Sequence, residues 1–149
     1  MSLKEQLTAD MKEAMKNHDK DRLSVIRMVR GAIRQAEIDG GHKELDDEAV
    51  IGVISKEVKM RKDSIDEFQK GGREDLVAKT QAEIDVLMPY LPAQLSEDEV
   101  KGLVKEAVEK TGAKTPKDMG KVMGLLMPKV KGRADGKLVN TIVRSMLQG

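Results

Sequence analysis

The sequence lacks cysteine and tryptophan and contains one phenylalanine and one tyrosine among 149 residues. Without cysteine the chain cannot form disulfides, thiolate nucleophiles or cysteine-based zinc and iron–sulfur sites. With 1% aromatic residues, it also cannot present the aromatic row on which single-stranded bases stack. The core must therefore be built from Leu, Ile, Val, Ala and the ten Met, which are flexible side chains that fill irregular gaps.

Histidine and long apolar runs are also scarce. The two histidines, His18 and His42, lie in polar segments that resemble loops, whereas a metal site or a Ser-His-Asp triad needs a histidine held by a fixed neighbour. The longest apolar run, residues 122–128, has seven residues, far fewer than the roughly 18 that cross a bilayer. We therefore predict no metal, no cofactor, no catalytic residue and no membrane partner.

The N-terminus points to the cytoplasm. Residues 1–5 carry an acid and a helix pattern where a secretory signal would need an apolar stretch. We therefore expect a soluble, cytoplasmic protein.

Apolar residues recur with the period of an α-helix along almost the whole chain. Glycine pairs, prolines and capping boxes at Ser2 and Ser96 divide the pattern. The fold class is therefore predicted to be all-α, with four helices followed by three. The expected helices cover about residues 3–17, 20–40, 46–71, 73–89, 96–112, 115–128 and 136–147, with a polar loop over residues 128–136.

The segment Pro-Tyr-Leu-Pro at residues 89–92 is the predicted boundary between two units. The first, residues 1–92, is expected to be a helical bundle, and the second, residues 93–149, a small three-helix basic unit. On the third helix Glu57 and Arg61 form a favourable i,i+4 ion pair, which we interpret as structural.

Charge is distributed unevenly, although the net charge is only +1. Residues 110–149 contain nine Lys or Arg against two Asp, which is +7 in this segment. Such a local field attracts polyanions, because neutralised phosphates release counterions. We expect these cations to face outward together as one surface; the alternative is that they only solubilise a small helical unit.

The densest part is the loop at residues 128–137. Lys129, Lys131, Arg133 and Lys137 flank Gly132 and Gly136, and a helix N-terminus follows. These features suit a phosphate. They do not form a nucleotide P-loop, because only three residues separate the glycines and Leu138 occupies the place of the metal-binding Ser or Thr. The alternative is an ordinary helix–helix connection.

Two further patterns have a structural and a functional interpretation. Gly120 and Gly124, with Lys121 beside them, lie on one predicted helix; we favour a tight helix–helix contact over docking on an RNA backbone. Arg27, Arg30 and Arg34 form a stripe on one helix face. Such a stripe is usually solvated or paired with acids of a neighbouring helix, and a second RNA contact is the less favoured alternative.

Several segments together resemble the bacterial YqeY family. They are residues 23–28 (LSVIRM), 61–64 (RKDS), 90–96 (YLPAQLS), 118–124 (DMGKVMG) and 131–136 (KGRADG). That family is similar to the tail of the B subunit of the tRNA-dependent amidotransferase. The resemblance implies an all-helical protein of two parts that lacks the catalytic domain for amide transfer. It also implies binding to tRNA, with the glycine and lysine blocks of the basic segment in contact with it.

The leading hypothesis is a non-catalytic protein that binds tRNA or another structured RNA, since few aromatics are available to stack single-stranded bases. The rival is an adaptor that docks on an amidotransferase, a synthetase or the ribosome through a Met119, Met123 and Met127 stripe. An amide-transfer enzyme is least favoured, for want of a nucleophile or metal set. A label of carbon–nitrogen ligase with glutamine as amido donor would come from the family, not from these residues.

Overall fold

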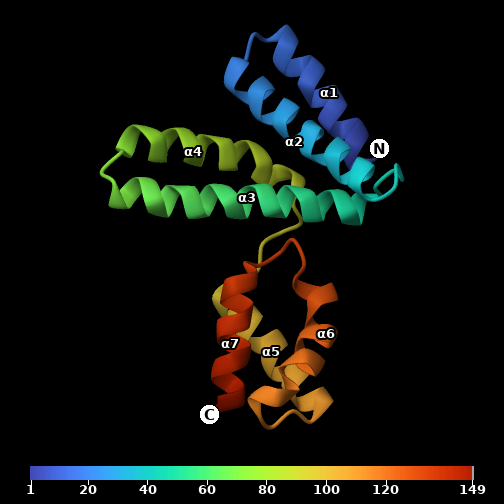
Figure 1. The fold of residues 1–149 in the computed structure, drawn as a ribbon, viewed down its shortest axis with the longest axis vertical. Coiled ribbons are helices and arrows are strands. Elements are labelled where there is room, and N and C mark those ends of the chain that lie inside the picture. The colour runs from blue at the N-terminus through green and yellow to red at the C-terminus, as the bar shows by residue number, and fades with distance from the viewer. Residues whose placement is uncertain (149) are drawn as a thin grey trace. The chain divides into compact units, whose positions relative to one another are not determined.

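The structure is a computed structural model that describes residues 1–148. Within these residues it contains seven α-helices, two short 3₁₀-helices and no strand (Figure 1). The predicted all-α class, four helices and then three, is confirmed. Contacts group the chain into two compact units, Met1–Leu91 and Pro92–Gly149, called unit 1 and unit 2 below. None of the described helices is long and apolar enough to cross a membrane.

Unit 1 consists of two antiparallel helix pairs, α1 beside α2 and α3 beside α4 (Figure 1). Its elements are α1 Leu3–Lys16, α2 Lys20–Asp39, α3 Asp47–Lys70, α4 Glu74–Leu87 and the 3₁₀-helix η1 Met88–Tyr90. The capping box at Ser2 is present, and the side chains of Asp19 and Asp46 accept backbone N–H bonds at the starts of α2 and α3. These bonds satisfy donors that have no partner within a helix.

The core of unit 1 draws on all four helices. Leu7, Ile26, Ile54 and Leu87 are fully buried within it. Tyr90 of η1 is buried beside them, and its hydroxyl donates to the carboxylate of Asp10 on α1. Burial raises the pKa of Tyr90, and the bond to Asp10 raises it further. The tyrosine therefore stays protonated and fixes η1 to α1.

Unit 2 is a three-helix unit with a separate core. Its elements are α5 Glu97–Thr111, the 3₁₀-helix η2 Pro116–Asp118, α6 Met119–Val130 and α7 Gly136–Gln148. One residue type dominates the buried positions: Val100 and Val104 of α5, Val122 of α6 and Val139 and Val143 of α7 are all at most 1% exposed. Met119 and Met123 pack against this core, whereas Met127 is exposed. Two of the three methionines of the predicted docking stripe therefore belong to the core.

Prolines mark the places where the predicted helix boundaries were wrong. α6 continues through Pro128 to Val130 instead of ending there. Pro128 lies in the last turn, so its missing donor removes one hydrogen bond, and the buried Val130 keeps the turn packed. Pro116 opens a 3₁₀ turn before α6, and Pro89 lies inside η1 after α4 has ended at Leu87.

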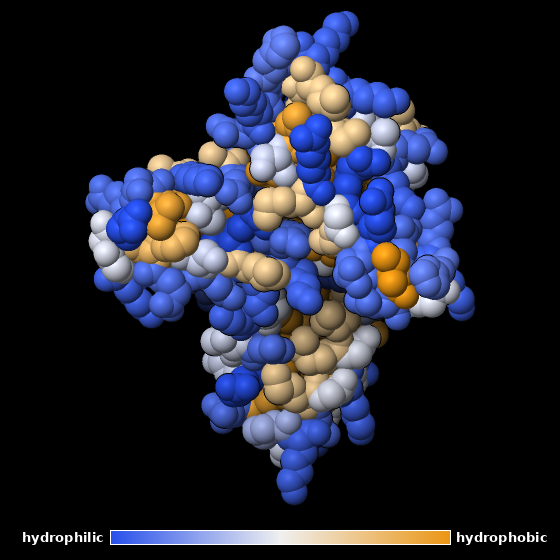
Figure 2. Space-filling model, turned by 45° about the horizontal axis from the view of Figure 1, so that its top comes forward, coloured by the Kyte–Doolittle hydropathy of each residue, from blue (hydrophilic) through white to orange (hydrophobic). Residues whose placement is uncertain are grey.

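Figure 2 shows one face of the molecule, where hydrophilic residues cover most of the surface and tan and orange apolar patches lie between them. The large apolar side chains that are exposed include Met28 and Met60 of unit 1 and Leu125 and Met127 of unit 2. Leu125 and Met127 lie on the same helix as Gly120 and Gly124.

Candidate nucleic-acid interface

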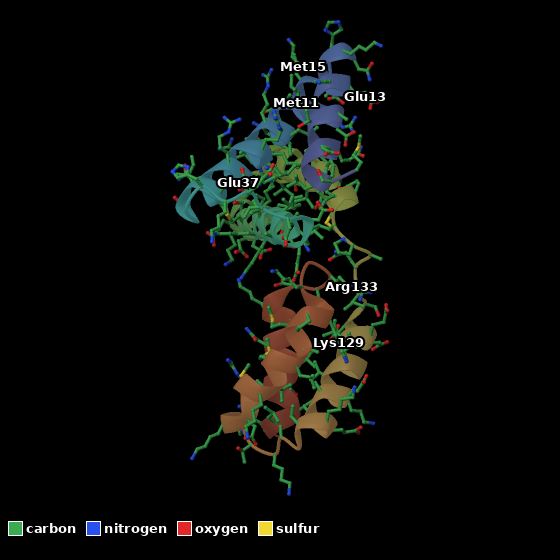
Figure 3. All side chains as sticks on the ribbon, turned by 90° about the vertical axis from the view of Figure 1, so that its right-hand side faces the viewer. Met11, Glu13, Met15, Glu37, Lys129 and Arg133 are labelled. Atoms are coloured by element: carbon green, nitrogen blue, oxygen red, sulfur yellow. The ribbon has the colours of Figure 1, made fainter. Side chains whose placement is uncertain are left out.

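The cations of residues 110–149 do not form a single acid-free surface. The Lys110 ammonium lies 2.7 Å from Glu106 Oε1 on α5. Lys129 Nζ lies 3.8 Å from the same oxygen, and Figure 3 places it on α6. The hydrogen bond from Lys110, followed by the charges of both lysines, lowers the pKa of Glu106. Two of the nine cations thus share an acid of their own unit.

Arg133 and Gly132 hold the α6–α7 loop in place. Arg133 Nε donates to the Ala93 carbonyl at 3.1 Å, and the Leu95 N–H donates to the Arg133 carbonyl at 2.8 Å. Gln94 Nε2 donates to the Gly132 carbonyl at 2.8 Å. Gly132 has φ of 74°, a left-handed conformation that favours glycine. The loop is therefore a helix–helix connection that is hydrogen-bonded to residues 93–95. Lys131 is exposed on it.

A second cation group lies at the opposite end of α6. Lys114, Lys117 and Lys121 lie within four residues of Asp118 in the sequence. The Asp118 carboxylate accepts the N–H of Lys114 at 3.1 Å and of Thr115 at 3.4 Å. These bonds, and then the charge of Lys121, lower the pKa of Asp118. Ten residues separate Lys121 from Lys131, about 15 Å of helix rise, so one phosphate group cannot contact both.

Gly120 and Gly124 are exposed, and a Cβ built at either glycine meets no atom within 4 Å. The favoured prediction of a tight helix–helix contact is therefore wrong for the described chain. Exposed neighbours on the same helix are Lys121, Leu125, Met127 and Pro128. With the two glycines they form what we call the open face of α6, turned away from buried Val122 and Leu126.

Gly124→Ala is expected to stabilise unit 2 by about 1 kcal/mol, because alanine is the better helix residue and space for its methyl group is present. Thermal unfolding of the full chain measures the change. Gly112→Ala is the control: its site is equally open, but φ is 66°, so alanine there is strained and lowers stability. Equal effects of the two substitutions would contradict this account.

The third group of cations lies on α7. The exposed side of this helix carries six polar residues, two of them cationic, and no acid. We call this set the α7 polar face: Lys137, Asn140, Thr141, Arg144, Ser145 and Gln148. The opposite side is buried in the core through Val139, Ile142, Val143 and Leu147. Four of the polar residues, from Thr141 to Gln148, line a hollow of about 440 Å³. Core packing thus holds the polar side outward.

Local bonds support the start of α7. The Lys137 N–H donates to Asp135 Oδ1 at 2.9 Å, and the Val139 N–H donates to the Asp135 carbonyl at 3.1 Å. Asp135 thus caps the start of α7. The Thr141 hydroxyl donates to the Lys137 carbonyl at 2.8 Å, which leaves its oxygen free to accept a bond from a ligand.

Sequence reasoning missed most of the α7 polar face. Asn140, Thr141, Ser145 and Gln148 carry no charge, and Arg144 entered only the count of cations. A usable signal was present, because residues 136–148 contain no Asp or Glu and place polar residues at helical spacing. Neutral donors and acceptors beside two cations are the groups that contact phosphate and sugar in nucleic acids.

The arginine stripe of α2 is not paired with acids. Arg27 and Arg34 are exposed, and Arg30 is half-buried with Nη1 donating to the sulfur of Met11 at 2.9 Å. Neither a carboxylate pair for these three arginines nor a metal-binding group of His, Asp or Glu is found in residues 1–148. The described chain thus offers cations and hydrogen-bonding groups for an anionic ligand.

Comparisons with known proteins identify the family of the chain. The model of the Yqey-like protein family matches residues 4–147. A relative from Pyrenophora tritici-repentis, "Altered inheritance of mitochondria protein 41, mitochondrial", is 38% identical over 95% of this chain and 78% of its own length. Proteins of the same name from Lachancea thermotolerans and Kluyveromyces lactis are 41% and 44% identical over 57% and 58% of the chain. In those two, the match spans 46% and 47% of the relative's length. The chain belongs to the Yqey-like protein family.

Proposed function

We propose that the chain is a non-catalytic protein that binds tRNA or another structured RNA through unit 2. The α7 polar face carries this proposal: six exposed polar side chains, two of them cationic and none acidic, lie on a helix whose other side is buried. Phosphate and sugar contacts in protein–nucleic acid complexes come from such side chains. The resemblance of this family to the tail of an amidotransferase subunit that binds tRNA supports the same ligand.

Folded RNA is favoured over single strands by the side chains that are available. The chain has one Tyr and one Phe, and Tyr90 is buried in unit 1. Few aromatic side chains are therefore available to stack on the bases of a single strand. Asn140, Thr141, Ser145 and Gln148 offer neutral donors and acceptors that suit sugar hydroxyls. Gly120 and Gly124, open to solvent, allow a backbone to approach α6 closely.

We propose no catalytic role for the residues described. The Yqey-like match extends over residues 4–147 and so includes nearly all of both units. The amide-transfer chemistry of the amidotransferase is assigned to a catalytic domain that this match does not include. The cytoplasmic localisation stays a prediction, and the names of the relatives place those proteins in mitochondria.

The test of the RNA proposal is the affinity of the full chain for a tRNA transcript at several salt concentrations. Lys137→Ala with Arg144→Ala is expected to weaken binding by about tenfold and to lower the slope of log affinity against log salt by about 2. The matched control is Lys101→Ala with Lys110→Ala, two lysines that pair with acids of α5. The control should change affinity less than the α7 variant. Equal effects, or a flat salt response of the wild type, would exclude the α7 polar face as the RNA contact.

The open face of α6 favours a second candidate function, an adaptor that docks on an amidotransferase, a synthetase or the ribosome. Leu125 and Met127 are 37% and 44% exposed beside the two open glycines. Met119 and Met123 are packed in the core, so only Met127 of the predicted stripe is available to a partner. Recovery of a protein partner after nuclease treatment, lost on Leu125→Asp, would favour the adaptor.

A further inference from the structure

A hollow between α1 and α2 of unit 1 is separate from the proposed RNA contact of unit 2. The two helices run antiparallel, with Lys4 Nζ 2.7 Å from Glu37 Oε2 at one end and Arg30 Nη1 2.9 Å from Met11 Sδ at the other. Figure 3 labels Met11 on α1 and Glu37 on α2. Between these contacts lies a cavity of about 240 Å³, lined by Lys4, Leu7, Thr8, Arg30, Ile33, Arg34 and Glu37.

The walls of this hollow combine an apolar floor with two guanidinium groups. Leu7 and Ile33 are 0% and 3% exposed and belong to the core of unit 1. Arg30 and Arg34 are four residues apart on α2, so they lie on the same face of the helix one turn apart, and both line the cavity. A rigid apolar base with convergent polar groups is typical of a small-ligand site.

Glu37, the acid that lines the hollow, already accepts hydrogen bonds from two other groups. Glu37 Oε2 accepts from Lys4 Nζ at 2.7 Å and from the Leu45 N–H at 2.9 Å. The bond from Lys4, followed by the bond from Leu45, lowers the pKa of Glu37. Glu37 is therefore charged, and it shares the Lys4 ammonium with Glu44, whose Oε1 lies 3.2 Å from Lys4 Nζ. The charge of Arg34 also lowers the pKa of Glu37, although no carboxylate of residues 1–148 forms an ion pair with Arg30 or Arg34.

The guanidinium of Arg30 is more buried than that of Arg34 and has only a weak hydrogen-bond acceptor. Arg30 is half-buried, and the hydrogen bond of its side chain within the described chain goes to the thioether sulfur of Met11. A thioether is a weak acceptor, so it replaces little of the hydration that a half-buried guanidinium loses. An oxyanion in the hollow would supply strong, charge-assisted acceptors to this group.

We propose that the hollow binds the phosphate group of a small phosphate monoester through Arg30 and Arg34. The planar guanidinium fork fits phosphate oxygens in a bidentate manner. A phosphate monoester carries a charge of about −1.5 to −2 at pH 7, and the guanidinium groups of Arg30 and Arg34 in the lining would attract it. A backbone phosphodiester carries about one negative charge per phosphate, and it would have to enter the hollow from a continuous chain. The larger charge and the absence of a continuing chain therefore favour a terminal or free phosphate.

The experiment titrates the full chain with inorganic phosphate and with adenosine 5′-monophosphate at constant ionic strength, followed by NMR of backbone amides. Both probes are expected to saturate and to shift the amides around Thr8, Ile33 and Arg34. Arg30→Gln and Arg34→Gln should each weaken affinity by about tenfold or more, since bonds to charged groups are strong. Arg27→Gln, one turn away on the same exposed stripe and outside the cavity lining, is the control and should bind as the wild type does.

Two further arms identify the source of the phosphate. An RNA hairpin with a 5′-hydroxyl end carries only diesters, and it should not compete with inorganic phosphate at this site. Lys137→Ala with Arg144→Ala should leave phosphate binding unchanged, so failure of the RNA proposal and failure of this one are distinguishable. Shifts that do not saturate, equal responses of the Arg27 and Arg34 variants, or competition by the hairpin would each overturn the proposal. Dispersed amide spectra of the variants verify that they are folded.

Discussion

Leu126→Ala is expected to unfold unit 2 in a large fraction of molecules while unit 1 keeps its structure. Leu126 is 0% exposed in the core of unit 2, and the two cores are formed by separate sets of residues. A buried Leu→Ala substitution costs about 2–5 kcal/mol, and a core of this size rarely supplies more than about 3–5 kcal/mol. Amide spectra of the full chain should lose the dispersed signals of unit 2 and keep those of unit 1.

The neighbouring leucine provides the control. Leu125 is 37% exposed on the open face of α6, whereas Leu126 is 0% exposed, so Leu125→Ala removes the same atoms with less loss of burial. It should lower the free energy of unfolding by less than about 1 kcal/mol. RNA binding should disappear in the Leu126 variant and remain in the Leu125 variant. Similar melting curves for the two variants would show that the core of unit 2 is not the one described.

The helices of this protein were largely predictable because their signals are local. Each boundary is marked by residues that lie close to it in the sequence. These are the capping boxes at Ser2 and Ser96, the glycines at 40, 71 and 112, and the ends of the apolar period. The structure has helix ends within a few residues of those predicted. The continuation of α6 through Pro128 was not predicted. A helix tolerates this proline because Val130 packs in the core, and that packing depends on the tertiary structure.

The candidate site was less predictable, because counting charges does not show which charges are compensated. The +7 segment was found from the sequence, but Glu106 of α5 lies outside it and pairs with Lys110 and Lys129. Arg133 is likewise held by the Ala93 carbonyl. The Glu106–Lys110 pair has i,i+4 spacing and is readable from the sequence once residues before 110 are included, whereas the contacts of Lys129 with Glu106 and of Arg133 with Ala93 need the fold.

The glycines of α6 illustrate the opposite error. A pair four residues apart predicts close packing when a second helix lies against it, and the sequence does not show whether one does. Here both positions face outward. The buried stripe of α6 instead passes through Val122, Leu126 and Val130.

Arg61→Met is expected to destabilise unit 1 by about 2–4 kcal/mol. Arg61 is 7% exposed, and it contacts Glu57 Oε2 at 2.8 Å and Glu83 Oε1 at 3.0 Å. The i,i+4 spacing in the sequence predicted the pair of Arg61 with Glu57, and this pair is confirmed. The pair with Glu83 joins α3 to α4, so it can be identified only from the folded structure. Removing the shared cation leaves two half-buried carboxylates without their partner, which is the costly way to break a buried ion pair. Denaturant unfolding of the full chain, following unit 1, measures the loss.

A triple variant separates the loss of charge balance from the loss of packing. Arg61→Met with Glu57→Gln and Glu83→Gln removes all three charges, and the methionine can pack beside Met28, whose sulfur lies 3.9 Å from Arg61 Nη2. Apolar or neutral replacements of buried ion networks are often nearly neutral, so most of the stability should return. Arg73→Ala removes an arginine whose pair with Asp75 is more than half exposed, and it should cost less than about 1 kcal/mol. If the triple variant is as unstable as Arg61→Met, the arginine stabilises unit 1 by the packing of its side chain and not by neutralising the two acids.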